Sequence, residues 1–564
     1  MKSIIERLKE VLLEEKERME SRASRKFGSS ELKALESGVA VVDSELSVEP
    51  GSLVGKRAGR GEIEPIGFVV DSKPRNKLKH KKLNRYIIRT LEPDDIPRSF
   101  EMAEAEFLYS LEKRIEILEM YEEIIGKFAP AVKVRRGFID QSQLIRNLDE
   151  YELEAVEASL SLEKGEVLIV MGPPGTGKTQ FITEAARLLG RKERVFVTSQ
   201  VHQAIDNMFE RLPPIDYALR IGSHRKVSEG AKRFSLEYKY LTTIPEIPNE
   251  AELAREYAER FKTIANKQRE ILSNKSFLVG ATATKSITEP LKEMEFDTVF
   301  IDEAHNLCIS TALLVLSRAK KAVIVGDYWQ LPPIYASINM NLNERAKFST
   351  FSFFNRLMNV KMTEMIWLRN HYRSNEKIIG YSAKYVYNGR IKTSGKCKYE
   401  KLDLPYPEFS WLNPDEPVIF FETDGEGEID EKKSTFNAKE AQIVSWIAKN
   451  IINAGIRSKD LAILTPFNAQ TRKIKEELRD EGLKNITVRT VHRYVGGEKD
   501  VIIFSTAATD PWSLTFIDKR LINVTVTRAK KKLIIVASRK ALSNESELTK
   551  LHQYIQTKGL IVKL

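Results

Sequence analysis

A glycine-rich stretch, MGPPGTGKT over residues 171–179, has the residue types and spacing of a phosphate-binding loop. It lies between the apolar run EVLIVMG and the helical run TQFITEAARLLG. Its glycines let backbone N–H groups point at phosphate oxygens, and the N-terminus of the following helix favours negative charge. We expect Lys178 to reach the β- and γ-phosphates of a nucleoside triphosphate and Thr179 to bind Mg²⁺. The other expected nucleotide contacts are Gly172, Pro173, Pro174, Gly175, Thr176, Gly177 and Gln180.

A pair of acids, Asp302 and Glu303, follows the apolar run TVFI. Asp302 could hold Mg²⁺, and Glu303 could orient or deprotonate an attacking water. A lone Asp-Glu pair after a strand can also cap the next helix. Its position two predicted strands beyond the phosphate-binding loop favours hydrolysis. For His305 we prefer a structural role, as a satisfied surface or interface histidine, over a catalytic one.

The run AVIVGDYWQLPP over residues 322–333 ends another predicted strand with Gly326 and Asp327, and then presents Gln330 ahead of two prolines. Parallel α/β sheets bind ligands at the carboxyl ends of their strands. We therefore expect the Gln330 amide to donate to a γ-phosphate or to the attacking water, and to accept from a neighbouring domain.

Parallel sheets must position these residues. From about residue 147, short and uniformly apolar segments alternate with helical ones, as is typical of a parallel sheet covered on both faces. The same alternation returns later, so the expected fold class is α/β with two parallel-sheet domains in tandem. We place the first at 147–340, with a charged helical insertion at about 223–275, and the second at 341–564.

The N-terminal part has a different pattern. Apolar residues near a 3.6-residue period predict an amphipathic helix within 1–30. Short β-like pieces punctuated by Gly and Pro predict a small β module over 31–100. A second long helix is expected to begin near Glu101, within 101–146, and the two helices could pair and carry the module between them.

The chain has 564 residues, a net charge of +11 and a pI of about 9.2. Positive charge is concentrated between Lys73 and Arg89, where no acid occurs. This run is either a solvated loop or a patch for nucleic-acid phosphates, and charge alone favours neither. The residues expected to form such a patch are Lys73, Arg75, Lys77, Lys79, Lys81 and Lys82.

Several other classes are disfavoured. The chain has no apolar run of about 18 residues, so neither a transmembrane helix nor a membrane partner is expected. The charged N-terminal segment does not resemble a signal peptide. Cys308 and Cys397 are too few for a zinc or iron–sulfur centre, which favours a cytoplasmic location without disulfides.

Together these stretches resemble the motifs of superfamily 1 subgroup B helicases, in the branch of the up-frameshift nonsense-decay and immunoglobulin-mu-binding helicases. GPPGTGKT, IDEAHN and VGDYWQLPP are similar to motifs I, II and III. VFVTSQVHQAIDNMFERL is similar to motif Ia, GATAT to the Ala-Thr segment, and LRNHYRSNEKII to the Gln-Tyr-Arg stretch. DLAILTPFNAQ is similar to motif IV, VRTVHRYVGGEKDVIIFSTA to motif V, and LINVTVTRAKKKLIIVAS to motif VI. The resemblance covers nearly the whole chain and implies two RecA-like domains with stalk helices and a small β-barrel.

The resemblance also implies ATP and Mg²⁺ as cofactors. Arg373 and Arg528 would be arginine fingers that close on the γ-phosphate, Tyr372 would stack on adenine, and Glu498 would contact the nucleotide. The residues that would touch a nucleic-acid backbone, at the ends of the strands opposite the nucleotide, are Thr198, Ser199, Thr282, Thr465 and Thr490. Ordinary strand packing is the alternative for each threonine.

The implied function is an ATP-driven helicase or translocase that moves 5′ to 3′ on single-stranded DNA or RNA and works as a monomer. The alternatives are a clamp that uses ATP only as a switch, a ribonucleoprotein remodeller without processive unwinding, and a ring-forming P-loop ATPase. The sequence does not choose between DNA and RNA, and it names no pathway or protein partner.

Three places depart from the family pattern. Glu152 stands where the family has a glutamine that reads adenine, and a carboxylate accepts hydrogen bonds but does not donate them. His371 replaces the glutamine before Tyr372, and His492 and Val495 stand where motif V usually has Asp and Gln. These changes weaken the case for strict adenine selectivity and favour hydrolysis that is slower or less tightly coupled to the strand.

Overall fold

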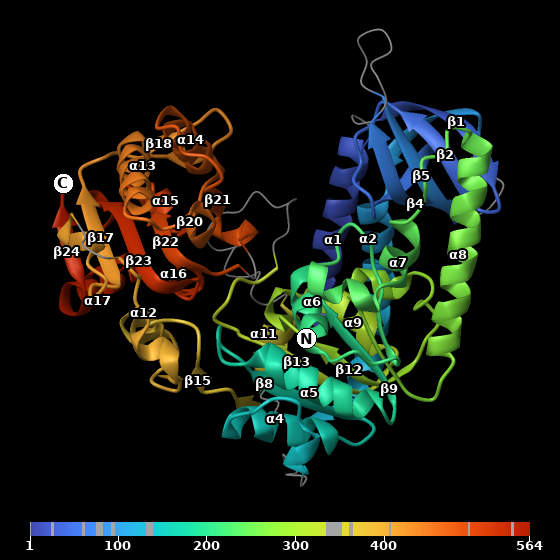
Figure 1. Ribbon diagram of the computed structural model, residues 1–564, viewed down its shortest axis with the longest axis horizontal. Helices are drawn as coiled ribbons and strands as arrows, with labels where there is room; N and C mark the ends of the chain where they lie inside the picture. The colour runs from blue at the N-terminus through green and yellow to red at the C-terminus, as the bar shows by residue number, and fades with distance from the viewer. Residues whose placement is uncertain are drawn as a thin grey trace.

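The computed structural model describes residues 2–23, 27–58, 62–74, 83–91, 96–130, 139–333, 352–359, 365–404, 408–494, 497–542 and 546–564. It shows an N-terminal barrel beside one parallel-sheet domain, with a second parallel-sheet domain across from them (Figure 1). The predicted α/β class is confirmed: two RecA-like parallel sheets follow each other in one chain, and a small β-barrel precedes them.

The N-terminal module is a closed antiparallel barrel with the strand order β1-β2-β5-β4-β3-β6. Side chains alternate along each strand, so one face of every strand points inward, and Val42, Val54 and Ile88 are part of the buried core. The strands are β1 (Gly28–Glu36), β2 (Val39–Ser44), β3 (Leu53–Ala58), β4 (Glu62–Pro74), β5 (Asn84–Thr90) and β6 (Ser99–Glu104).

Two helices pair beside the barrel. Helix α1 (Lys2–Ala23) contacts α2 (Glu106–Glu116), and both bury leucines in one core. The helix expected from Glu101 begins at Glu106 instead, because Ser99–Glu104 closes the barrel by pairing with β1 and β3. A 3₁₀ turn (Ile117–Met120) and the short helix α3 (Tyr121–Gly126) follow α2, so the expected single long helix is divided.

The first α/β domain contains an eight-stranded parallel sheet with the order β10-β11-β9-β12-β13-β8-β14, and β7 pairs with the start of β8. Its strands are β7 (Ala129–Pro130), β8 (Glu166–Met171), β9 (Arg194–Ser199), β10 (Ala218–Arg220), β11 (Phe277–Thr282), β12 (Phe296–Ile301), β13 (Ala319–Gly326) and β14 (Met365–Trp367). Its main helices are α4 (Glu150–Leu160), α5 (Lys178–Gly190), α6 (His202–Arg211), α9 (Ile309–Leu316) and α11 (Phe353–Asn359).

Strand β14 moves the boundary between the two domains. It pairs with β8 through Ile366 and Val170, although it lies well beyond residue 340. The first domain therefore extends to Trp367, and the boundary expected at 340 is wrong. A strand of three residues has no periodic pattern of its own, and only its pairing with β8 identifies it.

The helical insertion joins the barrel to the first domain. It contains α7 (Leu236–Leu241) and the long helix α8 (Glu250–Leu272), and α8 lies along β1 and β2 (Figure 1). Tyr257 packs on Val41 and Ile87 of the barrel, and its hydroxyl donates to Asp71 over 2.8 Å. The insertion thus covers one outer face of the barrel.

The second α/β domain contains a parallel sheet with the order β21-β20-β22-β23-β17-β24. Its strands are β17 (Val418–Thr423), β20 (Leu461–Thr465), β21 (Thr487–Thr490), β22 (Lys499–Ser505), β23 (Ala529–Ser538) and β24 (Leu560–Lys563). Its helices include α12 (Glu376–Tyr381), α13 (Ala438–Asn453), α14 (Asn468–Asp480), α15 (Pro511–Leu514), α16 (Lys519–Val526) and α17 (Glu547–Lys558). Short strand pairs also occur between β15 (Asn370–His371) and β16 (Lys392–Thr393), and between β18 (Glu428–Ile429) and β19 (Thr435–Phe436). Within the described residues, no helix has the length and apolar character needed to cross a membrane.

Candidate nucleotide site between the two domains

A cleft of about 560 Å³ lies where the two α/β domains face each other. The carboxyl ends of β8, β12 and β13 meet there, as expected for a parallel sheet. The predicted residues that line it are Pro174, Gly175, Gly177, Lys178, Thr179, Gln180, Asp302, Glu303, Gln330, Tyr372, Arg373, Glu498 and Arg528. Gly172, Pro173 and Thr176 belong to the same loop, which Thr176 closes by donating from its hydroxyl to the Pro173 carbonyl over 2.7 Å.

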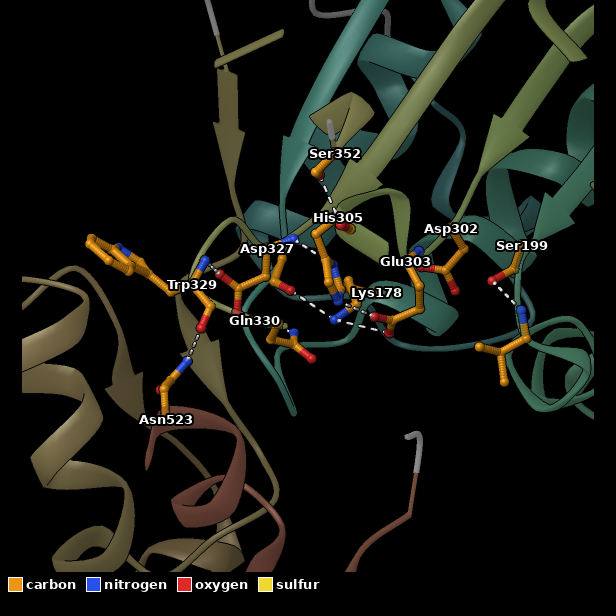
Figure 2. Close-up of polar contacts among 12 residues, drawn as sticks. Lys178, Ser199, Asp302, Glu303, His305, Asp327, Trp329, Gln330, Ser352 and Asn523 are labelled. Atoms are coloured by element: carbon orange, nitrogen blue, oxygen red, sulfur yellow. Dashed lines mark hydrogen bonds and ion pairs between the residues drawn. The ribbon is translucent and has the colours of Figure 1, made fainter. Parts of the chain in front are cut away.

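The phosphate-binding loop connects β8 to α5. Gly175 and Gly177 have φ values of 73° and 89°, a left-handed backbone that favours glycine, and Gly177 immediately precedes the helix. The Lys178 ammonium donates to the Gly172 carbonyl over 2.8 Å and lies 3.6 Å from a carboxylate oxygen of Glu303 (Figure 2). The N-terminus of α5 and the Lys178 charge therefore converge on one point in the cleft.

Asp302 and Glu303 follow β12 and extend into the same cleft. Burial, with the adjacent Glu303 charge, raises the pKa of Asp302 above its usual range. Burial opposes ionisation of Glu303 as well, but Lys178, together with smaller contributions from His305 and the two arginines of the cleft, outweighs it and holds the Glu303 pKa below its usual range. Glu303 is therefore the ionised acid, and Asp302 is a buried carboxyl group that a bound cation would help to ionise.

His305 connects these acids to the next strand, which the sequence did not predict. Its Nε2 lies 3.2 Å from Glu303, and its Nδ1 accepts from the backbone N–H of Asp327 over 3.2 Å (Figure 2). Burial lowers the pKa of His305 to about 4, so the ring is neutral and donates from Nε2 to Glu303. The sequence led us to expect a surface or interface histidine, but His305 is buried, and its ring orients the candidate catalytic acid.

Gln330 joins the first domain to the second. Its amide nitrogen donates to Asp327 over 3.2 Å, and its amide oxygen accepts from the Arg528 guanidinium over 3.4 Å. Asn523 of α16 donates to the backbone carbonyl of Trp329 over 3.1 Å, beside this contact (Figure 2). The loop after β13 therefore touches the second domain through both side chain and backbone.

Two arginines face the cleft: Arg373, in the linking segment beside Gly175, and Arg528, just after α16 in the second domain. Arg373 forms an ion pair with Glu498, which also pairs with Lys530 over 2.7 Å. Arg528 is buried, and its Nε has no hydrogen-bond partner among the described residues. Burial and the neighbouring charge of Arg373 lower the pKa of Arg528 to about 10. Two guanidinium groups this close together, with one donor left unpaired, indicate an anion site.

The segment that links the domains is fastened to the phosphate-binding loop. The backbone N–H of Tyr372 donates to the Gly175 carbonyl over 2.8 Å, and His371 Nδ1 donates to the Pro174 carbonyl over 2.8 Å. His371 Nε2 accepts from the N–H of Ser374 over 2.9 Å. Burial lowers the pKa of His371 to about 3, which fits a neutral ring that donates at one nitrogen and accepts at the other.

The far end of the cleft is formed by Tyr372, Asp149 and Glu152. Tyr372 is 41% exposed, and its hydroxyl donates to Asp149 over 2.7 Å. Asp149 caps α4, and Glu152 accepts from the Asp149 backbone N–H over 2.9 Å to complete a capping box. The buried Glu152 carboxyl has a pKa raised to about 7, because desolvation disfavours its charge. Glu152 already differs from the glutamine of the family pattern, and the helix cap also engages one of its two carboxyl oxygens.

The five candidate strand contacts lie in the last two residues of their strands, at the carboxyl edge where the nucleotide cleft also lies, so the predicted placement at the opposite end is wrong. Ser199 and Thr282 pair across β9 and β11, and Thr465 and Thr490 pair across β20 and β21. In parallel sheets the loops after all strands leave on one side. Thr198, Ser199, Thr465 and Thr490 are buried, whereas Thr282 is partly exposed and lines a second cavity.

The basic run is only partly within the described residues. Lys73 lies at the end of β4, while Arg75, Lys77, Lys79, Lys81 and Lys82 fall outside the described ranges, as does Val495 of motif V. Arg85, which belongs to the same run, is buried in an ion pair with Asp43 over 2.8 Å and contacts Glu250 over 2.7 Å. The described residues of this run therefore lie in different environments, because Arg85 is buried in ion pairs and Lys73 is partly exposed.

Comparisons with known proteins agree with this geometry. Two AAA-domain family models match residues 147–338 and 350–540, in the order of the two α/β domains. The chain is 30% identical over 448 residues to the DNA replication ATP-dependent helicase/nuclease DNA2 of Bos taurus, covering 75% of this chain and 40% of that protein. It is 27% identical over 483 residues to the DNA polymerase alpha-associated DNA helicase A of Schizosaccharomyces pombe, covering 77% and 70%.

The chain thus spans about 40% of the length of its DNA2 relative. Among solved structures, an arterivirus nonstructural protein 10 helicase matches with a TM-score of 0.35 and 10% identity, over 90% of this chain and 76% of that one. The two family models and the sequence relatives together cover both α/β domains and the cleft between them. The chain therefore belongs to the superfamily 1 helicases, in the branch of the up-frameshift and DNA2 helicases.

Proposed function

We propose that the chain is an ATP-driven translocase that moves 5′ to 3′ on single-stranded DNA or RNA. The contact between Arg528 and Gln330 carries this proposal, because it joins the second domain to the loop that follows β13 in the cleft with the phosphate-binding loop. A change at the terminal phosphate would alter this contact and move the domains relative to each other. Relatives named as helicases support the same class of activity.

The cleft suits a magnesium nucleotide. The Thr179 hydroxyl and the buried Asp302 carboxylate line it together, and Mg²⁺ prefers one or two such oxygens completed by phosphate oxygens and water. Within the described residues, no cluster of three or more acids, histidines or cysteines could hold a metal without such help. Bound Mg²⁺ would neutralise charge on the β- and γ-phosphates.

For hydrolysis, we assign Glu303 as the group that orients and deprotonates the attacking water. Its ionised carboxylate lies between Lys178 and His305, so its position is fixed from two sides. Arg373 and Arg528 would stabilise the charge that develops on the γ-phosphate. Departure of that phosphate removes the anion shared by the two domains, which lets Arg528 and Gln330 separate.

A monomer is sufficient for this chemistry, because the phosphate-binding loop and both arginines come from one chain. Ring-forming P-loop ATPases instead complete such a cleft between subunits. Cys308 and Cys397 are both buried and form no disulfide, which fits a reducing compartment such as the cytoplasm.

The test is ATP hydrolysis measured with and without single-stranded DNA and RNA oligonucleotides, followed by duplex displacement from 5′ and 3′ overhangs. We expect stimulation by single strands that decreases with salt, because phosphate contacts release counterions. Displacement should require a 5′ overhang. Hydrolysis that no oligonucleotide changes would contradict the proposal, and strand binding that depends on ATP without displacement would indicate the clamp instead.

A further inference from the structure

A second cavity, of about 600 Å³, lies where the barrel, the helical insertion and the first α/β domain meet. Leu53 and Phe68 of the barrel and Leu241 of α7 contribute apolar walls. Thr282, at the carboxyl end of β11, lies at the same cavity, which connects it to the edge where the candidate strand contacts end. Its volume falls in the range typical of small-molecule and nucleotide pockets.

The packing of β5 against α8 separates two arginines of the basic run. Side chains at alternate positions of β5 face the insertion, so Arg85 meets Glu250, Ile87 packs in one cluster with Tyr257, and Arg89 lies against Phe261. Arg85 is paired with Asp43 of β2 and with Glu250 at the start of α8. Arg89 is at the other end of the strand, where the second cavity begins.

Arg89 is a half-buried cation without an anionic contact. Among the described residues its side chain makes no hydrogen bond or ion pair, and its guanidinium carbon lies 5.1 Å above the ring of Phe261. Burial lowers its pKa, while Glu237 and Glu289, which line the same cavity without contacting Arg89, act in the opposite direction. A cation withdrawn from water costs free energy unless an anion approaches it, so this position favours an anionic ligand.

Other groups around the cavity suit the same ligand. Lys285 lies with its ammonium 4.9 Å above the ring of Phe68. The hydroxyls of Thr90 and Ser223 are buried and have no hydrogen-bond partner within the described part of the chain. Cations held over aromatic rings, available hydroxyls and apolar walls together match a nucleotide, which has both a phosphate and a flat base.

We propose that this cavity binds one nucleotide unit of the single strand, with its phosphate on Arg89 and its base against the apolar walls beneath the barrel. This inference rests on the proposed function, since a strand held at the carboxyl edge near Thr282 is what would reach the cavity. A free mononucleotide has the same chemistry, and the experiment below separates the two sources.

The experiment measures binding of a fluorescent 20-nucleotide dT strand, and of its RNA counterpart, by anisotropy at several salt concentrations. Arg89→Met should weaken binding about tenfold and reduce the slope of log K against log salt by about 1, the value for one lost phosphate contact. Arg89→Lys should keep the wild-type slope, because it keeps the charge. The matched control is Arg57→Met, since Arg57 lies over Phe27 at the same 5.1 Å on the same barrel but outside the cavity.

Thermal unfolding checks that the variants fold, and Arg89→Gln replaces Arg89→Met in the binding assay if the latter does not. Equal affinities and slopes for the Arg89 and Arg57 variants would overturn the inference. A packing role for Arg89 would also overturn the inference. In that case Arg89→Lys would bind the strand as weakly as Arg89→Met, and the slope of log K against log salt would be the same in all variants. Binding of dTMP that Arg89→Met abolishes, with no effect on the strand, would reject the strand as the source. Wild-type protein that binds no strand at all would instead contradict the proposed function.

Discussion

The Arg528 guanidinium donates to the Gln330 amide oxygen over 3.4 Å, across the interface between two domains whose sheets share no strand. The same Gln330 amide donates to Asp327, which follows β13 directly. One side chain therefore links a strand of the first domain to an arginine of the second, and this link can be tested from either end.

Replacing Gln330 by alanine removes the link from the first domain. We expect kcat of ATP hydrolysis to fall about 10²-fold, because the amide no longer positions the second domain at the phosphate. Nucleotide affinity should change little, since Lys178 and the loop remain. Steady-state kinetics and titration with a fluorescent ATP analogue measure the two quantities. Gln553→Ala, on the exposed surface of α17, is the control, and a loss confined to affinity would contradict the assigned role.

Replacing Arg528 by lysine tests the other end. Lysine keeps the charge but not the planar fork of donors, so it cannot contact Gln330 and a phosphate oxygen together. We expect hydrolysis to fall about 10³-fold with strand binding retained. Arg539→Lys is the control, because Arg539 is a half-exposed arginine of the same domain that pairs with Glu422. Near-normal turnover in Arg528→Lys would show that Arg528 is only a packing residue.

Replacing Glu303 by glutamine preserves the shape of the side chain and removes the base. We expect turnover to fall by about 10²–10⁴-fold while ATP and strand binding persist, because Lys178 and Arg528 still meet the phosphates. Single-turnover hydrolysis and nucleotide binding are the measurements. Glu293→Gln, at a mostly exposed position of the same domain, serves as the control. Unchanged turnover would show that another residue is the catalytic base.

Glu152 gives a pH-dependent stability. Its pKa in the folded protein is raised to about 7, so the folded state holds a proton that the unfolded chain loses near pH 4.5. The free energy of unfolding should therefore fall as pH rises from about 4.5 to about 7, by roughly 1–3 kcal/mol, and stay lower above that.

Glu152→Gln removes this ionisation, so the variant should unfold at a higher temperature than the wild type at pH 8 and at a similar one at pH 4.5. Thermal unfolding across this pH range, without nucleotide, is the measurement. Glu157→Gln on the same helix is the control. If the stability of the wild type rose over this pH range relative to that of Glu152→Gln, the pH dependence would have the opposite sign. That result would contradict a raised pKa for Glu152.

The sequence predicts the nucleotide cleft well because its signals are local. The loop before Lys178 and the acids after β12 are each defined by a strand, a turn and a few side chains, and parallel pairing then brings their carboxyl ends together. His305 was not predicted as a link, because its partners Glu303 and Asp327 become neighbours only when β12 and β13 pair.

The sequence does not predict contacts between segments that lie far apart along the chain. Arg85 and Arg89 look equivalent in one basic run, yet Arg85 meets Asp43 and Glu250, while Arg89 faces a cavity. Their difference arises because α8, far along the chain, lies against β5. Strand β14 was missed for the same reason, since three residues carry no pattern and its partner β8 lies far away in sequence.

The fastening of the linking segment has a consequence for how the domains rotate. Tyr372 is tied to Gly175 of the first domain, whereas the Ser374 hydroxyl donates to the Ala529 carbonyl of the second over 2.6 Å. The backbone torsions between these two anchors belong to Arg373. The Ser374 N–H also donates to His371 Nε2, so this short turn is held to both domains. A rotation of one domain about the other would therefore shift Arg373, whose side chain lines the cleft.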